Sequence, residues 1–253
     1  MSAASLRAAA GPTLAVLAGL AAWALVAHRA GPLLLAGPVE VLQALVSERA
    51  RLLEATARTA VSAVGGLALA TTLGLLLAVG AWWSRALRAA LLPYTVVLQV
   101  IPIVAIAPLL VVWLGYGTAV ALTTATLAAF YPVYSAATTG LAAPPRELVD
   151  LFHLYGATRL RELVLLRLPA ALPALFSGLR SAAGLAVIGA IVGEFVGSNG
   201  FPPTLGYLVV YAARSARPDL CFAAIVGAAV LALCLHVVVR WAERRAIGRW
   251  YGV

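Results

Sequence analysis

The sequence predicts an all-α integral membrane protein, a single domain over residues 1–253 with about six transmembrane helices. Hydrophobic residues make up 63% of the chain and charged residues 11%, with a mean hydropathy of +1.00, whereas soluble domains carry about 25% charged residues. Several uncharged runs are long enough to cross the roughly 30 Å of a bilayer core. The net charge of +9 comes from arginines spread between these runs, which is typical of helix flanks and argues against nucleic-acid binding.

The first span is expected over residues 8–28. It follows the single Arg7, so a signal peptide is the competing interpretation. The residues after the run, which include His28, Arg29 and Pro32, do not form a small-residue cleavage site. We therefore interpret the run as a retained helix that anchors the chain in the lipid bilayer.

Residues 31–58 have a different pattern, in which Pro32 and Pro38 interrupt the chain and apolar residues then alternate with charges. This spacing predicts an amphipathic helix at the membrane surface. Residues 59–84 are uncharged and form the second predicted span.

No charged residue occurs between Arg88 and Arg146. Such a run is too long for one span at 1.5 Å per residue, and the glycines at 115 and 117 mark the natural divide. The third span is therefore predicted over 93–114, interrupted by Pro102 and Pro108, and the fourth over 118–139. Prolines within membrane helices are tolerated where neighbours or water satisfy the freed carbonyls, which makes Pro102 and Pro108 weak candidates for a substrate pathway.

The fifth and sixth spans are predicted over 170–196 and 220–240, separated by a loop with Pro202 and Pro203 that is helical over 205–213. Three glycines at a spacing of four would let another helix approach the fifth span closely. Two ionisable residues in this span are pathway candidates, because charges inside a membrane are costly. Glu194 could line a substrate entry or simply be solvated at an aqueous mouth, and Arg180 could reach the inner interface or meet an anionic substrate. The glycines are Gly189, Gly193 and Gly197.

The arginines predict the orientation. With both termini in the cytoplasm, eleven arginines lie on the inner side and six on the outer side, which satisfies the positive-inside rule. All 18 basic residues are arginine. A Walker A phosphate loop needs a lysine, so an ATP site with its Mg²⁺ would have to lie on another polypeptide. The sequence contains no evident catalytic, metal-ligand or cofactor set on this chain.

One charged segment, residues 146–169, interrupts the apolar second half. Residues 147–155 predict about two helical turns, which Gly156 can end in a left-handed conformation. Thr158 can cap a second helix that runs to Leu168 and Pro169, where the fifth span begins. An ordinary inter-span loop is the plain alternative, but two short helices continued into a span would also make a lever.

The order of residues in this segment resembles the cytoplasmic EAA loop of bacterial ABC importer permeases. The loop's pattern is Glu-Ala-Ala, three residues, Gly, nine residues, Ile, one residue, Leu-Pro. Here Asp150, Leu151 and Phe152 replace the first three positions, Gly156 keeps its place, and Leu166 stands for the isoleucine before Leu168 and Pro169. The resemblance implies that the segment contacts the ATPase, through Glu147, Asp150, Leu151, Phe152, Gly156, Ala157, Thr158, Arg161, Leu168 and Pro169.

Further stretches resemble the permeases for taurine, alkanesulfonates, nitrate and pyrimidine-type precursors. They are residues 37–45, 101–117 and 192–209. This resemblance implies a type I ABC importer permease fold, a homodimer of two permease copies, two copies of a separate ATPase, and an extracytoplasmic solute-binding protein. The expected function is ATP-driven import of a small organic or anionic solute across the bacterial inner membrane.

The alternative function is a secondary transporter or channel driven by an ion gradient. It would require internal repeats or paired carboxylates within spans, and the sequence shows neither. An intramembrane enzyme would require a catalytic pair within the spans, and Glu194 has no such partner in its own span.

Overall fold

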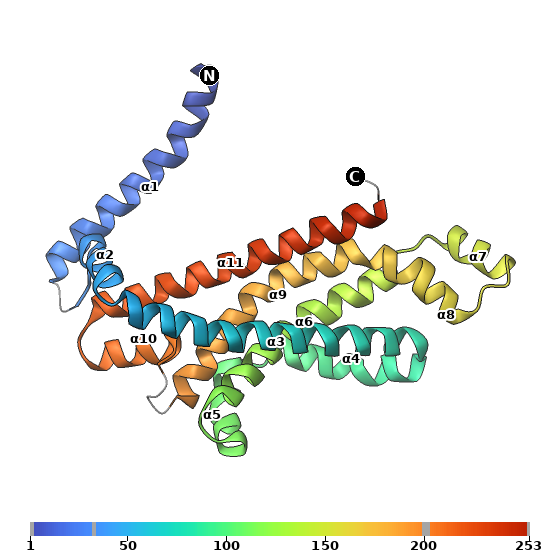
Figure 1. Ribbon diagram of the computed structural model, residues 1–253. Helices are drawn as coiled ribbons and strands as arrows, with labels where there is room; N and C mark the ends of the chain where they lie inside the picture. The colour runs from blue at the N-terminus through green and yellow to red at the C-terminus, as the bar shows by residue number, and fades with distance from the viewer. Residues whose placement is uncertain (1–2, 32–33, 199–202, 252–253) are drawn as a thin grey trace.

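Four long helices run side by side in the computed structural model, which describes residues 3–31, 34–198 and 203–251 (Figure 1). Each is long and apolar enough to cross a membrane. α6 packs against both α3 and α9, and α11 packs against α9. The four helices are α3 (Arg49–Trp83), α6 (Thr118–Leu141), α9 (Leu168–Gly197) and α11 (Pro218–Tyr251).

The third predicted span is a bent pair rather than one helix. α4 (Arg85–Val100) begins before the predicted boundary, and α5 (Ile103–Leu114) leaves it at 104°. The break lies at Pro102, the N-cap of α5, because proline has no N–H to continue α4 and forces the preceding residue into an extended conformation. An interruption is predicted at Pro102, and the bend lies there, whereas Pro108, the other predicted interruption, lies inside α5.

The number of spans depends on this pair and on the first helix. Among the described residues, four helices meet the length and composition of a span, or five if α4 and α5 count as one. α1 (Ala3–Ala30) adds a shorter apolar stretch, Leu14–Ala30. The fold is all helical, and the number six stays a prediction.

The helix predicted at the membrane surface divides into two parts. α2 (Pro38–Ser47) is separate, whereas residues 49–58 form the first turns of α3. α1 contacts α2, and the Trp23 indole N–H donates to the Ala36 carbonyl at 3.1 Å. Pro32 and Pro202, expected in breaks, lie outside the described residues.

The core between the long helices is built mainly from alanine. Lipid tails are as apolar as leucine, so membrane helices associate through close packing of small residues rather than through hydrophobic burial. Large apolar side chains lie on the outside instead, for example Leu53, Val61 and Leu233, which are 70%, 73% and 65% exposed. Fully buried alanines on α3, α6 and α9 include Ala55, Ala63, Ala70, Ala125, Ala129, Ala137, Ala182, Ala186 and Ala190.

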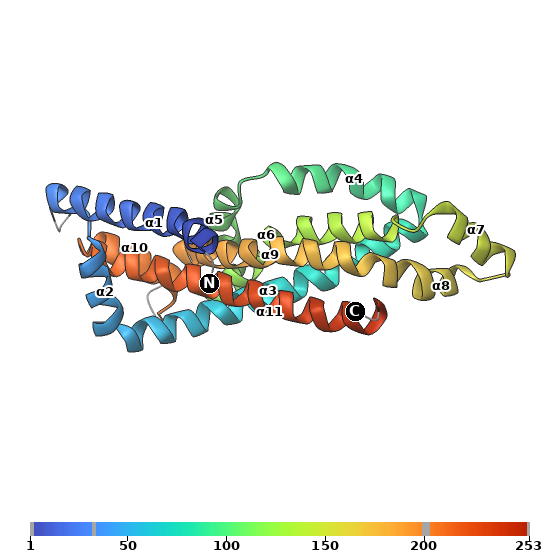
Figure 2. The same ribbon diagram turned by 90° about the horizontal axis from the view of Figure 1, so that it is seen from above.

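The bundle carries different short helices at its two ends (Figures 1 and 2). α7 (Arg146–Leu154) and α8 (Arg159–Glu162) project from one end, and α2 and α10 (Leu205–Arg214) lie at the other. The helix predicted over 205–213 is present as α10, capped by the Thr204 hydroxyl.

Candidate functional site

The charged segment, residues 146–169, forms the corner predicted from the sequence. α7 ends at Leu154, Gly156 two residues later has a φ of +69°, and the Ala157 N–H donates to the Phe152 carbonyl at 2.9 Å. No atom lies within 4 Å of the position a Cβ would take at Gly156. The requirement for glycine is therefore conformational, since residues with a Cβ rarely adopt this φ.

The second half of the segment continues into the membrane helix without a break. The Thr158 hydroxyl accepts a hydrogen bond from the Arg161 N–H at 3.3 Å and caps α8. A π-helical turn, Leu163–Arg167, then joins α8 to α9. Pro169 lies just after this turn, at the start of α9, and its missing N–H removes one bond from the helical ladder there. Motion of α8 would therefore be transmitted directly along α9.

Glu162 anchors the segment to the bundle, a role that the sequence analysis missed. Its side chain is buried, the residue being 4% exposed, and it accepts from Arg167 at 2.6 Å and contacts His153 at 3.2 Å. Arg167 also donates to the Leu141 carbonyl at 2.8 Å and lies 5.2 Å from the ring centroid of Trp82. The five-residue spacing of Glu162 and Arg167 matches the π turn, whose hydrogen bonds span five residues.

α7 presents an exposed apolar surface at the end of the bundle. None of its residues is buried; Leu148 and Leu151 are 43% and 44% exposed, and Tyr155 just after the helix is 82% exposed. Of the predicted coupling residues, Glu147, Asp150 and Arg161 are also exposed, while Phe152, Ala157, Leu168 and Pro169 are partly buried. The segment thus offers both apolar and charged groups to a partner.

The glycine stripe of α9 packs against α6 as predicted. A Cβ at Gly189 would lie 2.6 Å from the Thr124 carbonyl oxygen and 2.8 Å from the Ala125 Cα. Gly193 faces Thr124 and Ala121, and Gly197 faces Val120. These three positions let the backbones of α9 and α6 touch.

Glu194 lies within packed protein, away from any aqueous mouth. The residue is 4% exposed, and its Oε2 accepts from the Thr59 hydroxyl at 3.0 Å and from the Gly206 N–H at 2.9 Å. The Thr59 oxygen in turn accepts from the Leu205 N–H at 3.0 Å. The carboxylate thus joins α3, α9 and the first turn of α10.

Arg180 has a protein partner in the structure, and whether it also reaches the inner interface or an anionic substrate stays a prediction. Its guanidinium forms an ion pair with Glu243 of α11. Pro102 and Pro108 are exposed on the α4–α5 break and on α5. None of the four predicted pathway residues lines the cavity of about 820 Å³ beside the charged segment, and their pathway role stays a prediction.

A second ion-pair cluster lies at the α2 and α10 end. Arg217 donates to Glu48 and to Asp219, both at 2.8 Å. These hydrogen bonds, first that to Asp219, raise the pKa of Arg217, which keeps the guanidinium charged. In the described part of the chain, no group of three or more His, Cys, Asp or Glu residues could hold a metal ion.

Comparisons with known proteins agree with this architecture. The family described as "Binding-protein-dependent transport system inner membrane component" matches residues 70–248. A probable ABC transporter permease protein of Haemophilus influenzae is 41% identical over 83% of this chain and 84% of its own length. The formylaminopyrimidine transport permease protein ThiX of Halalkalibacterium halodurans is 35% identical, over 74% and 76%. The taurine transport system permease protein TauC of Escherichia coli is 28% identical, over 95% and 88%.

The fold also has a solved counterpart. A chain of the MetNI methionine ABC transporter, in an inward-facing conformation, superposes with a TM-score of 0.58 at 21% identity, over 81% of this chain and 96% of that one. The family match covers more than half of the chain. The protein therefore belongs to the binding-protein-dependent transport system inner membrane components and is a multi-pass permease of an ABC importer, a transport subunit rather than an enzyme.

Proposed function

We propose that the charged segment is the element through which a separate ATPase drives this permease. The observation that carries the proposal is its direct helical continuity with α9, together with the exposed apolar surface of α7. An ATPase that binds α7 would move α8 and α9 together as one rigid body. In the predicted orientation, α7 and α8 lie in the cytoplasm, where the ATPase is found.

The mechanism is a rigid-body change of access. Closure of an ATPase dimer would displace the two charged segments of a permease homodimer, and α9 would carry this displacement into the packed α3–α6–α9 core. Close α9–α6 packing at the glycine stripe favours movement of whole helices over local bending. A solute-binding protein would deliver the solute at the α2 and α10 end.

The solute class follows from the relatives. The names of three of them specify formylaminopyrimidine, taurine and riboflavin transport. We extend this to a small organic or anionic solute for the present chain, such as a sulfonate, taurine, nitrate or a pyrimidine or vitamin precursor. Binding assays on the partner solute-binding protein test the class directly.

The coupling role is tested by Gly156→Val in the reconstituted transporter. A β-branched residue at φ +69° strains the corner between α7 and α8, so ATP hydrolysis should continue while uptake per ATP falls by about tenfold. Gly115→Val is the matched control, because Gly115 also has a positive φ, +75°, and open space around it, but lies away from the segment.

The proposal fails if Gly156→Val keeps the wild-type uptake per ATP. It also fails if Gly115→Val lowers that ratio equally, since the effect would then come from backbone strain anywhere in the chain.

A further inference from the structure

An arginine-lined cavity lies between the bundle and the charged segment. It measures about 820 Å³ and opens among α3, α4, α6, α7 and α8. Five arginines line it against a single carboxylate, Asp150. The arginines are Arg85, Arg88, Arg146, Arg159 and Arg167.

Two of these arginines have hydrogen-bond or ion-pair partners within the protein. Arg167 pairs with Glu162, and Arg159 donates to the Trp83 carbonyl at 3.3 Å. For the guanidinium groups of Arg85, Arg88 and Arg146, the described residues provide no ion pair and no hydrogen bond. These three positive groups therefore face a cavity whose lining contains a single carboxylate, Asp150.

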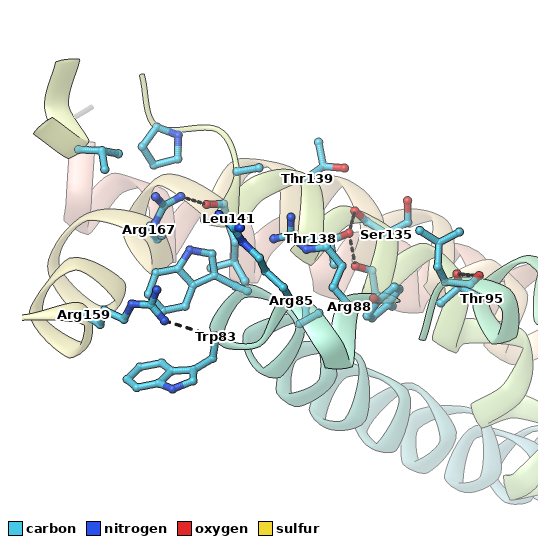
Figure 3. A pocket seen from close by; sticks show the side chains of 18 of the residues that line it. Trp83, Arg85, Arg88, Thr95, Ser135, Thr138, Thr139, Leu141, Arg159 and Arg167 are labelled. Carbon is cyan, nitrogen blue, oxygen red and sulfur yellow. Dashed lines mark hydrogen bonds between the residues drawn. The ribbon is translucent and has the colours of Figure 1, made fainter. Parts of the chain in front are cut away.

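The two arginines of α4 point toward α6. Figure 3 shows Arg85 and Arg88 reaching from the first turns of α4 toward Ser135 and Thr138. Arg146 and Arg159 belong to the opposite wall, which is part of the charged segment. A ligand held by both walls would bridge α4 and the charged segment.

Hydroxyl groups complete the lining. Thr95 and Thr138 donate to carbonyls of their own helices, so their hydroxyl protons are used. Ser135, Thr139 and Tyr131 also line the cavity and carry O–H groups that can donate. Guanidinium forks combined with hydroxyl donors match the several acceptor oxygens of a tetrahedral oxyanion.

We propose that this cavity is a binding site for a phosphate- or sulfate-type oxyanion, held by Arg85, Arg88 and Arg146. The group could belong to an anionic phospholipid of the inner leaflet, which attracts basic residues next to membrane helices, or to a free oxyanion in the cytoplasm. In both cases the ligand ties α4 to the charged segment. The site is distinct from the solute specificity proposed above and does not depend on it.

The test uses the full-length chain purified with its ATPase, in nanodiscs of phosphatidylcholine. Sulfate is the soluble probe, and thermal unfolding is followed in sulfate and in chloride at equal ionic strength. The test variant is Arg85→Gln with Arg88→Gln. The control is Arg240→Gln with Arg244→Gln, which removes the same charge from two exposed residues of α11 outside the cavity.

The control is necessary because sulfate stabilises most proteins by exclusion from their surface. Binding adds a saturable stabilisation that depends on the site. We expect the apparent sulfate affinity to weaken by about tenfold in the test variant and to stay unchanged in the control. Should the double variant not fold, Arg146→Gln probes the opposite wall with the same readout.

A second arm identifies a lipid ligand. Native mass spectrometry of the transporter purified from phosphatidylglycerol-containing membranes measures how much of this lipid is retained. Loss of retention in the test variant alone, without a sulfate effect, assigns the site to a phospholipid headgroup. A sulfate effect alone assigns it to a free oxyanion. Equal behaviour of test and control variants in both arms overturns the proposal.

Discussion

Two buried carboxylates show how differently single residues are held in this permease. Glu162 and Glu194 are each 4% exposed, but Glu162 is paired with the Arg167 guanidinium while Glu194 meets neutral donors, the Thr59 hydroxyl and the Gly206 N–H. Removing a buried carboxylate strongly destabilises a protein when its paired cation remains without a partner. The two sites therefore respond differently to substitution.

Glu162→Ala should destabilise the protein by about 3 kcal/mol, because Arg167 would keep a mostly buried charge without its partner. Glu54→Ala is the matched control: its pair with Arg58 is exposed on both sides and is worth less than about 1 kcal/mol. Thermal unfolding in detergent measures both. Equal losses would contradict the anchoring role of Glu162.

Thr59→Val should cost about 1 to 3 kcal/mol, since valine keeps the shape but leaves the Leu205 N–H without its acceptor and removes one of the donors to Glu194. Thr72→Val on the same helix removes only a hydroxyl that bonds to its own helix at Ala68. This control should change stability little. A Thr59 variant as stable as the control would show that the α3–α9–α10 junction does not depend on this hydroxyl.

At the scale of elements, contact between α9 and α6 depends on the absence of side chains. Gly189→Ala would put a Cβ 2.6 Å from the Thr124 carbonyl oxygen, so the helices must separate and the protein should lose about 1 to 3 kcal/mol. Gly184→Ala, also on α9, meets no atom within 4 Å. It should stabilise the helix by up to about 1 kcal/mol. Equal unfolding temperatures for the two variants would contradict this packing.

Elements with local signals were predictable, and those set by distant contacts were not. The corner at Gly156, the cap at Thr158 and the helix after Thr204 follow from short-range hydrogen bonding that the sequence encodes directly. Prolines 102 and 108 look alike in sequence, so an interruption was predicted at both, and only neighbouring helices decide which one bends the chain.

Among the site residues too, those with a local sequence signal were predictable and those whose partners are distant in sequence were not. The glycine stripe was recognisable because its spacing is a property of one helix. The partners of Glu162, Glu194 and Arg180 lie 5, 135 and 63 residues away in sequence, and for the two distant pairs no local pattern names the partner. Glu162 and Arg167 were missed because their spacing requires a π turn, which has no simple sequence signal.

At the scale of the whole molecule, the orientation predicts which end meets the cytoplasm. Tyr155→Cys at the end of α7 and Ala213→Cys in α10 place exposed thiols at opposite ends, in a background with Cys221 and Cys234 replaced by alanine. A membrane-impermeant maleimide should label the α10 position in right-side-out vesicles and the α7 position in inside-out vesicles. The reverse pattern would invert the predicted topology.

The length of α3 makes the permease sensitive to the thickness of its membrane. The uncharged part of this helix, residues 59–83, extends about 37 Å, which exceeds the roughly 30 Å of an average hydrocarbon core, so the helix must tilt or the lipid must stretch. Because α3 packs along α6, a change in the tilt of α3 would also shift the packed α3–α6–α9 core. Bilayer composition therefore acts on this permease as a mechanical input, alongside the solute and the ATPase.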